Sequence, residues 1–317
     1  MTKRYYFSAL LSILCLLTIG LFVRLLHDTI AIELISFHRA FFAFIFLLVV
    51  AHFLDKDFWK VSLRDVRDYA IVGFLLAVTM ITFNIALTLA PLKDVYFLNY
   101  VHVFVAPVAA IFLLREKFSR NNVLLTILGV IGIALINPFT GQSITGNFLA
   151  LISGTSYALM TVYARKVDKH HSLGDVAWFM GFAALFLLPF GWDKGLLNVP
   201  AMDWPVLIGL GVVSTGFGYL FYNIALEKLR VHVISMLDLI VTTIGTILLS
   251  VVYFGEVLPP FTLLGGVMVA VVGVLFALES HLLDAGLKLP SNASFRYVTG
   301  SSKGKSRRTR RRSPIRK

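Results

Sequence analysis

Cysteine and charge are both scarce in this chain. Cys15 is the single cysteine, which excludes an intramolecular disulfide and a cysteine-ligated metal site and leaves the redox compartment open. Charged residues make up 15% of the sequence, whereas soluble domains contain about 25%. This composition argues against a soluble globular protein.

Motifs for catalysis and for ATP hydrolysis are missing as well. The sequence has no Gly-x-x-x-x-Gly-Lys-Ser/Thr loop to hold nucleotide phosphates and no His-Glu-x-x-His zinc motif. His38, His102 and Asp238 do not stand at metal-ligand spacing, and we expect the two histidines to serve packing. We therefore predict no enzyme activity, no catalytic residue, no metal and no cofactor.

Long apolar blocks are what the chain has in abundance, since 58% of its residues are hydrophobic. About 20 apolar residues in a helix cross the hydrocarbon layer of a bilayer. The sequence predicts an all-α, multi-pass integral membrane protein, placed in the plasma (inner) membrane. The predicted transmembrane helices are 6–26, 32–54, 69–90, 94–114, 122–138, 146–164, 174–192, 204–226, 231–254 and 260–279.

The first block resembles a signal peptide, because it follows Lys3 and Arg4. It lacks a small-x-small cleavage site, so we expect it to be a retained span. With the N-terminus in the cytoplasm, fourteen Lys and Arg fall in cytoplasmic segments. Only Arg24, Lys93 and Lys194 fall on the outer side. Cytoplasmic loops are enriched in Lys and Arg, so this distribution predicts ten spans with both termini inside.

Short sequence matches recur at offsets between 139 and 141 residues. Asn84-Ile85-Ala86-Leu87 returns as Asn223-Ile224-Ala225-Leu226, Glu116 matches Glu256, and Gly132 matches Gly273. Each repeat then holds five helices, and an odd number inserts the second copy upside down. Two inverted repeats place a substrate site near the midplane, between the halves. We predict a first repeat over 1–140, a second over 141–280 and a disordered basic cytoplasmic tail over 281–317.

The chain resembles the drug/metabolite transporter superfamily, in particular its EamA-type members. The resemblance covers about residues 6–280 and rests on Arg39 and Pro107, together with short motifs at the ends of helices. These motifs are Leu113-Leu114-Arg115-Glu116-Lys117, Tyr253-Phe254-Gly255-Glu256 and Gly265-Gly266. The resemblance implies ten helices around a central cavity, lined mainly by the first, third, fourth, sixth, eighth and ninth. It implies transport of amino acids, other small metabolites, or sugar and nucleotide derivatives.

Asp238 and Asn99 are the most informative polar pair, because the repeat offset relates them and both fall on expected cavity helices. Polar groups in a bilayer are costly, so each needs a reason. Asp238 could bind a substrate ammonium or carry a coupling proton. The alternative is a structural partnership with Lys228, Arg230 or a backbone group.

Further candidates share faces with this pair at helical spacing. Pro107 is expected to kink its helix, since it leaves the carbonyl near Val103 without a donor. The tyrosines could equally be packing or interface residues. The predicted cavity residues are Tyr96, Asn99, Tyr100, Tyr157, Tyr222, Ser235, Asp238 and Thr242.

Arg39 lies about eight residues into its helix, in the opposite leaflet from Asp238. Its planar guanidinium suits a substrate carboxylate or phosphate. The structural alternative is that it bonds neighbouring helices and fixes their packing. Because the two charges lie in opposite leaflets, we do not predict a direct ion pair between them.

The predicted function is that of a secondary transporter that works without ATP and exports small polar metabolites such as amino acids. An exchanger or flippase for sugar-phosphate, nucleotide-sugar or lipid-linked substrates is the alternative, but it would want more Lys and Arg on cavity helices. A non-transporting scaffold is the third reading. The basic tail predicts binding to anionic lipid headgroups rather than nucleic acid. The sequence leaves the oligomeric state open.

Overall fold

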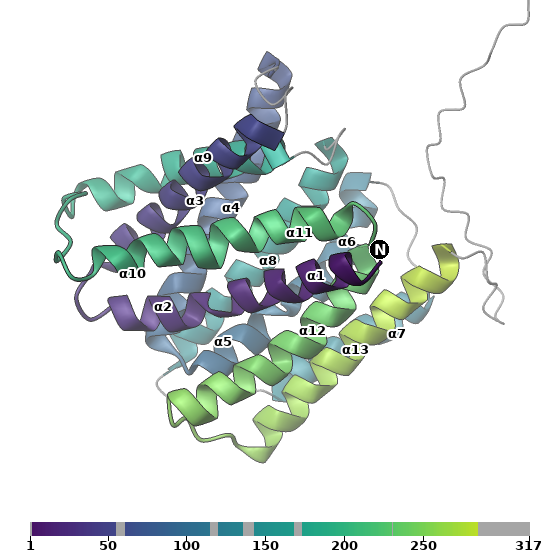
Figure 1. The fold of residues 1–317 in the computed structure, drawn as a ribbon. Helices are drawn as coiled ribbons and strands as arrows, with labels where there is room; N and C mark the ends of the chain where they lie inside the picture. The colour runs from purple at the N-terminus through teal and green to yellow at the C-terminus, as the bar shows by residue number, and fades with distance from the viewer. Residues whose placement is uncertain are drawn as a thin grey trace, which may run out of the picture.

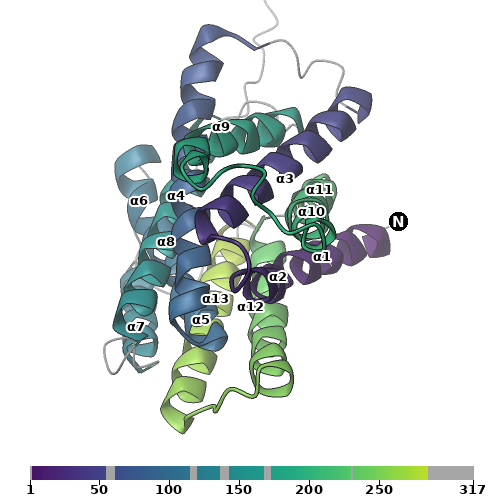
Figure 2. The ribbon, with the colours of Figure 1, turned by 90° about the vertical axis from the view of Figure 1, so that its left-hand side faces the viewer.

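The protein is described as a computed structural model, which covers residues 2–54, 61–114, 120–135, 143–167, 173–229 and 231–284. The described residues form helices joined by short turns (Figures 1 and 2). Several helices continue directly into the next after a one-residue interruption or a change of helix type. In chain order they are α1 (Thr2–Leu17), α2 (Ile19–Leu26), α3 (Ile32–Leu54), α4 (Leu63–Leu89), α5 (Leu92–Asn99), α6 (Val101–Leu114), α7 (Arg120–Leu135), α8 (Ile144–Val167), α9 (Leu173–Trp192), α10 (Trp204–Gly209), the π-helix η2 (Leu210–Phe217), α11 (Gly218–Leu226), α12 (Val231–Leu248), the π-helix η3 (Leu249–Tyr253) and α13 (Pro260–Asp284).

The length and composition of six helical stretches suffice to cross a membrane. They are Lys3–Leu26, Ile32–Leu54, Leu63–Leu89, Leu92–Leu114, Leu173–Trp192 and Trp204–Leu226. Two shorter apolar stretches, Leu237–Tyr253 and Pro260–Leu275, accompany them. Large apolar side chains face outward, as Phe112 and Val252 show at 79% exposed. Such a surface suits lipid, and the chain is an integral, multi-pass membrane protein.

Local sequence sets several helix ends. Ser62 and Asp65 form a capping box at the start of α4, in which each side chain accepts a hydrogen bond from the other's backbone N–H. The first predicted span is interrupted at Thr18, where the hydroxyl donates to the Cys15 carbonyl at 2.6 Å. The fourth is interrupted at Tyr100, between α5 and α6. These interruptions are absent from the hydropathy pattern, which predicted continuous helices.

The packing partners of the two halves mirror one another. Helix α4 packs on α8, and α1 packs on α11. Helix α6 packs on α8, and α12 packs on α1. In the two matched halves, α1 corresponds to α8, α4 to α11 and α6 to α12. Exchanging each helix for its counterpart turns the α4–α8 contact into the α11–α1 contact, and the α6–α8 contact into the α12–α1 contact. Helices α3 and α9 pack on each other, as do α7 and α13.

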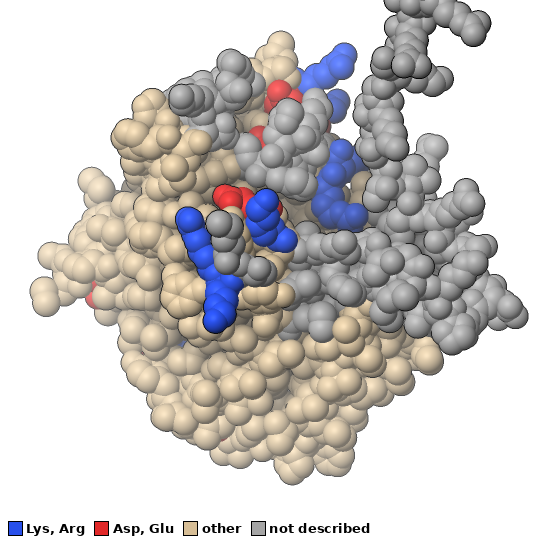
Figure 3. All heavy atoms as spheres, turned by 45° about the vertical axis from the view of Figure 1, so that its right-hand side comes forward, with Lys and Arg blue, Asp and Glu red and all other residues tan. Residues whose placement is uncertain are grey.

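Charged side chains are distributed unevenly over the surface. Figure 3 brings forward the side of the molecule that carries the N-terminus, and Lys and Arg gather in its upper and central parts while the lowest part in view is tan. Helix α8 carries Arg165 and Lys166 in its last turn. Residues 281–284, predicted to begin the tail, belong to α13, and 285–317 lie outside the described residues.

Candidate functional site

Arg39 is held inside the bundle by neutral partners from two other helices. Its side chain projects from α3, and the residue is 6% exposed. Nε donates to the Thr215 hydroxyl of η2 and Nη1 to the Asn84 carbonyl oxygen of α4, each at 3.0 Å. The Asn84 amide in turn donates to the Ser36 hydroxyl at 2.9 Å. We call these four residues the Arg39 network.

A change of helix type places one of these partners. The π-helix η2 carries Thr215, whose hydroxyl also donates to the Leu210 carbonyl at 3.2 Å. Isolated π-helical turns occur often at functional sites, because the extra residue frees backbone groups and re-aims side chains. One turn later, Tyr219 lies close enough to Arg39 to interact with it electrostatically. No sequence signal pointed to η2 or to Tyr219.

Asp238 lies in the middle of a group of tyrosines. Its Oδ1 accepts a hydrogen bond from Thr242, one turn along α12, at 2.8 Å. Four tyrosines lie within electrostatic range of its carboxylate, and all four were predicted cavity residues. They are Tyr96, Tyr100, Tyr157 and Tyr222. We call Asp238, Thr242 and these tyrosines the Asp238 site.

Three residues of the Asp238 site, namely Tyr157, Tyr222 and Asp238, are half-buried. Tyr219, which lies near Arg39, is half-buried as well.

Tyr96 and Tyr100 are more tightly packed, with 8% and 4% of their surface exposed. The Tyr96 hydroxyl donates to the Leu17 carbonyl at 2.9 Å and accepts from the Gly20 N–H at 3.1 Å. Tyr96 thus fastens α5 to the break between α1 and α2. The Tyr100 hydroxyl lies beside the hydroxyl of Thr242 but makes no hydrogen bond of ordinary geometry with a described residue.

Asn99 is hydrogen-bonded to α8. Its amide donates to the Ser153 hydroxyl of α8 at 2.9 Å, and Ser153 donates to the Thr79 carbonyl of α4 at 3.0 Å. Gly154 lets the α8 backbone approach here, since a Cβ at that position would overlap the Asn99 carbonyl. The two residues related by the repeat therefore occupy different surroundings, with Asn99 at a helix contact.

The remaining sequence candidates fall in varied places. Helix α6 continues through Pro107, and the interruption lies seven residues earlier, at Tyr100. The His38 ring packs edge-on against Trp204 at 5.4 Å. His102 packs against Tyr157 at 5.1 Å, at the border of the Asp238 site. The side chain of Ser235 lies outside the described residues. In the described part of the chain, no cluster of His, Cys, Asp and Glu could hold a metal.

A second arginine, Arg24, is half-buried where α2, α4, α5 and the end of η3 meet. Nη1 of Arg24 forms an ion pair with Glu256 at 2.7 Å. Nε and Nη2 donate to the carbonyls of Leu87 and Ala90, at 3.2 and 2.8 Å. The guanidinium also lies over the Phe254 ring, 4.6 Å from its centroid. We call this set the Arg24 network.

Glu256 does more than neutralise Arg24. Its carboxylate also accepts from the backbone N–H of Leu92 at 2.7 Å and from that of Lys93 at 3.4 Å. It therefore caps α5, a helix of the other sequence repeat, where the helix dipole favours negative charge. Arg24 falls on the predicted outer side, where Lys and Arg are rare. This unusual position was the sequence signal that could have indicated a partner for Arg24.

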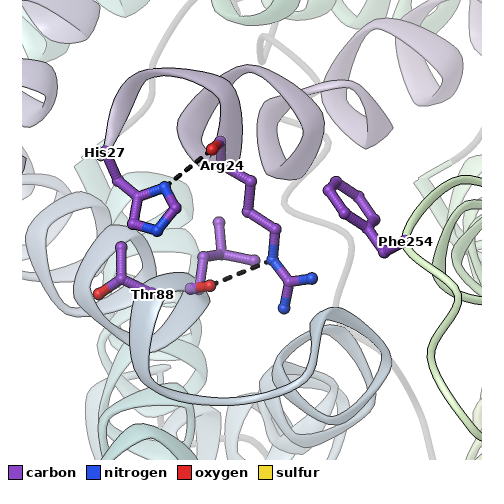
Figure 4. Close-up of a pocket in the computed structure, with 5 residues that line it drawn as sticks. Arg24, His27, Thr88 and Phe254 are labelled. Atoms are coloured by element: carbon purple, nitrogen blue, oxygen red, sulfur yellow. Dashed lines mark hydrogen bonds between the residues drawn. The ribbon is translucent and has the colours of Figure 1, made fainter. Parts of the chain in front are cut away.

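A cavity of about 330 Å³ opens beside the Arg24 network. Figure 4 shows Arg24 reaching across it from α2, with His27 and Thr88 on one side and Phe254 on the other. Every nitrogen of the Arg24 guanidinium already has a partner. The cavity therefore borders an arginine whose charge is already neutralised by Glu256.

The EamA-like transporter family matches the chain twice, over residues 3–137 and 144–278. The chain belongs to this EamA-like transporter family. Its two matched copies cover the parts that hold the Arg39 network and the Asp238 site. Membership makes the protein a membrane transporter of the drug/metabolite transporter superfamily.

Three relatives extend the finding. An uncharacterized transporter of Archaeoglobus fulgidus is 29% identical over 85% of this EamA-type chain and 94% of its own length. The pseudopaline exporter CntI of Pseudomonas aeruginosa is 23% identical over 66% of this chain and 74% of its own. The uncharacterized transporter YetK of Bacillus subtilis is 23% identical over 78% of this chain and 81% of its own.

A solved crystal structure shares the fold of this EamA-type chain. It superposes with a TM-score of 0.62 at 16% identity, and the match covers 87% of this chain and 98% of the other. At this identity, the likeness concerns the arrangement of helices alone.

Proposed function

We propose that the protein is a secondary transporter that exports small polar metabolites, such as amino acids, by alternating access around the Asp238 site. The observation that carries the proposal is an acidic side chain near four tyrosines, half-buried on an apolar helix of a membrane protein. The walls come from both repeats, since α5 belongs to the first and α8, α11 and α12 to the second. A carboxylate in that position suits a substrate ammonium or a coupling proton.

The proposed architecture is ten transmembrane helices in two inverted five-helix repeats. Two matched family copies and the exchanged packing partners of the two halves support it. Similar halves in opposite orientation give two packings of similar energy, and each packing opens the site to one side of the membrane. We place both termini in the cytoplasm, since Lys and Arg gather at the N-terminal end (Figure 3).

In this orientation, the Arg24 network lies on the outer side, and we propose that it closes the site from outside. It joins α2, α4 and α5 to the end of η3, so those four segments cannot separate while it holds. Opening outward would require the Arg24–Glu256 contact to break. The name of the Pseudomonas aeruginosa relative, an exporter, supports transport in the outward direction.

The alternative substrates are sugar phosphates, nucleotide sugars and lipid-linked compounds. A substrate with several phosphates needs several cationic side chains that are not already paired with carboxylates. Among the described residues, Arg39 is the buried cationic side chain that forms no ion pair. We therefore favour a substrate with at most one anionic group. Binding of anionic lipid by the basic tail stays a proposal for residues outside the described ranges.

The test is uptake and counterflow in proteoliposomes, with labelled amino acids, nucleobases and sugar phosphates, each with and without a proton gradient. We expect saturable flux of one class, competed by unlabelled members of that class. Protein reconstituted with Asp238→Asn is the matched control for leak. A folded protein that moves nothing across the panel would contradict the proposal and favour a lipid substrate or a non-transporting scaffold.

A further inference from the structure

One face of α12 carries a polar side chain at every fourth position, although the helix as a whole is apolar. These residues are Asp238, Thr242, Thr246 and Ser250, the last of which belongs to η3, the continuation of α12. Side chains four positions apart lie above one another on a helix. At about 1.5 Å per residue the set extends over roughly 18 Å, more than half of a hydrocarbon layer. We call these four residues the polar row.

The opposite face of α12 and η3 is apolar and exposed, at 45% or more for each of its four residues. They are Ile240, Ile244, Leu248 and Val252. This face suits contact with lipid. The hydroxyl-bearing residues of the polar row are buried instead, at 8% exposed for Thr242 and 0% for Thr246 and Ser250. The helix therefore turns its polar row into the bundle.

Two hydroxyls of the polar row have no hydrogen-bond partner among the described residues. They belong to Thr246 and Ser250, and the burial of both residues means that solvent does not reach them in this conformation. The Tyr100 hydroxyl, which lies beside Thr242, also lacks a described partner. A buried hydroxyl without a partner destabilises the state that contains it. Three such groups in one place indicate that another conformation supplies their partners.

Each end of the polar row meets a contact described above. At the inner end, Thr242 donates to Oδ1 of Asp238 at 2.8 Å. At the outer end, the Ser250 carbonyl accepts from the Glu256 N–H at 2.8 Å, and the Glu256 carboxylate holds Arg24 at 2.7 Å. Ser250 thus lies on the same short segment as the acid that closes the bundle on the proposed outer side. Breaking the Arg24–Glu256 contact would release that segment.

We propose that the polar row is the path by which water and protons reach Asp238 from the outer side once the Arg24–Glu256 contact opens. The inference rests on the proposed function and adds the coupling ion and its route. Successive side chains of the row lie about 6 Å apart along the helix axis. One water molecule with two hydrogen bonds of about 2.8 Å bridges such a gap.

The direction of proton movement follows from this arrangement. Each hydroxyl of the polar row can accept a hydrogen bond from one water and donate to the next. An excess proton from the outer solution therefore passes inward along the row. It ends on the carboxylate of Asp238, which becomes a neutral acid.

Other titratable groups lie at the two ends of this path. The four tyrosines of the Asp238 site surround its inner end from the first repeat and from α8 and α11, and tyrosine hydroxyls keep their protons near neutral pH. At the outer end, Arg24 pairs with Glu256, and Lys93 pairs with Asp94 at 3.3 Å. The burial of Thr246 and Ser250 interrupts the path between these ends, which prevents a proton leak in the closed state.

The test measures water access by placing a cysteine at each hydroxyl position. Cys15 is the single native cysteine, so Cys15→Ser gives a background without thiols. Thr246→Cys and Ser250→Cys are close in size to the native residues. A negatively charged methanethiosulfonate that does not cross membranes, added outside right-side-out vesicles, reacts only with thiols that water reaches. Leu248→Cys is the matched control, since Leu248 is 56% exposed on the apolar face.

We expect both hydroxyl positions to react from outside. The reaction should be about tenfold faster with Glu256→Gln, because a weaker outer contact raises the open fraction by that factor. The Leu248→Cys control should stay unreactive in both backgrounds. If neither Thr246→Cys nor Ser250→Cys reacts from outside in the Glu256→Gln background, or if both react only from inside, the inference is wrong.

A flux measurement separates proton delivery from substrate binding. Thr246→Val keeps the side-chain shape and removes the hydroxyl. It should slow proton-driven transport about tenfold, the effect of one lost hydrogen bond, and leave counterflow within about twofold, since counterflow needs no net proton movement. Thr243→Val is the control, because its hydroxyl is already bonded to the Leu239 carbonyl, and it should retain both fluxes.

The two assays keep this inference distinct from the proposed function. Equal losses of both fluxes in Thr246→Val, or undiminished proton-driven transport, would overturn the proton path and leave a transporter in place. If the wild-type protein shows neither flux, the proposed function fails. The thiol reaction needs no substrate, so it then still decides whether water enters along the polar row.

Discussion

Two arginines lie between helices of this transporter, Arg39 buried and Arg24 half-buried, and they are paired in opposite ways. Arg24 has a carboxylate, two backbone carbonyls and an aromatic ring. Arg39 has an amide oxygen and a hydroxyl. The guanidinium of Arg24 is neutralised by a carboxylate and bonds three segments, so it holds helices together. The guanidinium of Arg39 keeps its charge, because its partners among the described residues are neutral. A buried charge is better classified by its partners than by its depth.

The largest effect should come from neutralising the carboxylate of Asp238. We expect Asp238→Asn to lower transport by about 100-fold, since a general acid/base or binding carboxylate contributes on this order. Flux in proteoliposomes should also lose its dependence on pH, while membrane abundance stays normal. Normal, pH-dependent flux in this variant would remove Asp238 from the mechanism.

Substitutions that keep the positive charge distinguish the roles of Arg24 and Arg39 most directly. Lys cannot reproduce two simultaneous bonds of a planar guanidinium. Arg39→Lys should therefore reduce transport by roughly tenfold, whereas Arg24→Lys should keep the ion pair to Glu256 and retain most of the flux. Equal losses in the two variants, measured at equal reconstituted amounts, would erase the distinction between the networks.

Removing the carboxylate of the Arg24 network should act on stability. We expect Glu256→Ala to lower the free energy of unfolding by about 2 kcal/mol, because Arg24 loses its partner and α5 loses its cap. The contact is 12–15% exposed, which is why the value lies below that of a fully buried pair. The change in the free energy of unfolding is measured by unfolding both proteins in detergent and following tryptophan fluorescence.

Glu227→Ala is the control for that measurement, since Glu227 is exposed at the end of α11. Its effect should stay within about 0.5 kcal/mol. A double exchange, Arg24→Glu with Glu256→Arg, should restore only part of the loss. The swapped glutamate can meet the arginine, but an arginine at 256 cannot accept from the α5 backbone.

The smallest effects should come from two neighbouring threonines of α12. The Thr243 hydroxyl donates to the Leu239 carbonyl at 2.6 Å, whereas the buried Thr246 hydroxyl has no hydrogen-bond partner among the described residues. Thr243→Val should cost about 1 kcal/mol and Thr246→Val should be neutral or stabilising, as for an unsatisfied buried hydroxyl. The same unfolding assay compares them, and the reverse order would mean that Thr246 is hydrogen-bonded.

Helix positions were largely predictable from the sequence, and the interior contacts were not. Apolar length sets where a helix begins and ends in a bilayer, so the predicted 32–54 and the observed Ile32–Leu54 agree. Hydropathy carries no signal for the breaks at Thr18 and Tyr100 or for η2, since those depend on side chains from other helices. The Arg24–Glu256 contact joins residues 232 apart, beyond the reach of local patterns.

Repeat symmetry holds for the packing of whole helices and not for individual side chains. The helix contacts of the two halves correspond. The sequence relates Asn99 to Asp238, and the structure gives these two side chains different hydrogen-bond partners. Asn99 finds Ser153 on α8, while the carboxylate finds tyrosines. Side-chain roles diverge between repeats even where the helices correspond.

The 232-residue separation of Arg24 and Glu256 also has a consequence for biosynthesis. At the usual speed of a ribosome, about 5–20 residues per second, Arg24 leaves the synthetic machinery roughly 10–50 s before its carboxylate exists. During that interval Glu256 has not been made. The Arg24 guanidinium therefore lacks its counter-charge, and the start of α5 lacks its cap. The nascent first repeat must therefore shelter an unpaired charge, against lipid headgroups or within the insertion machinery, until the second repeat arrives to complete it.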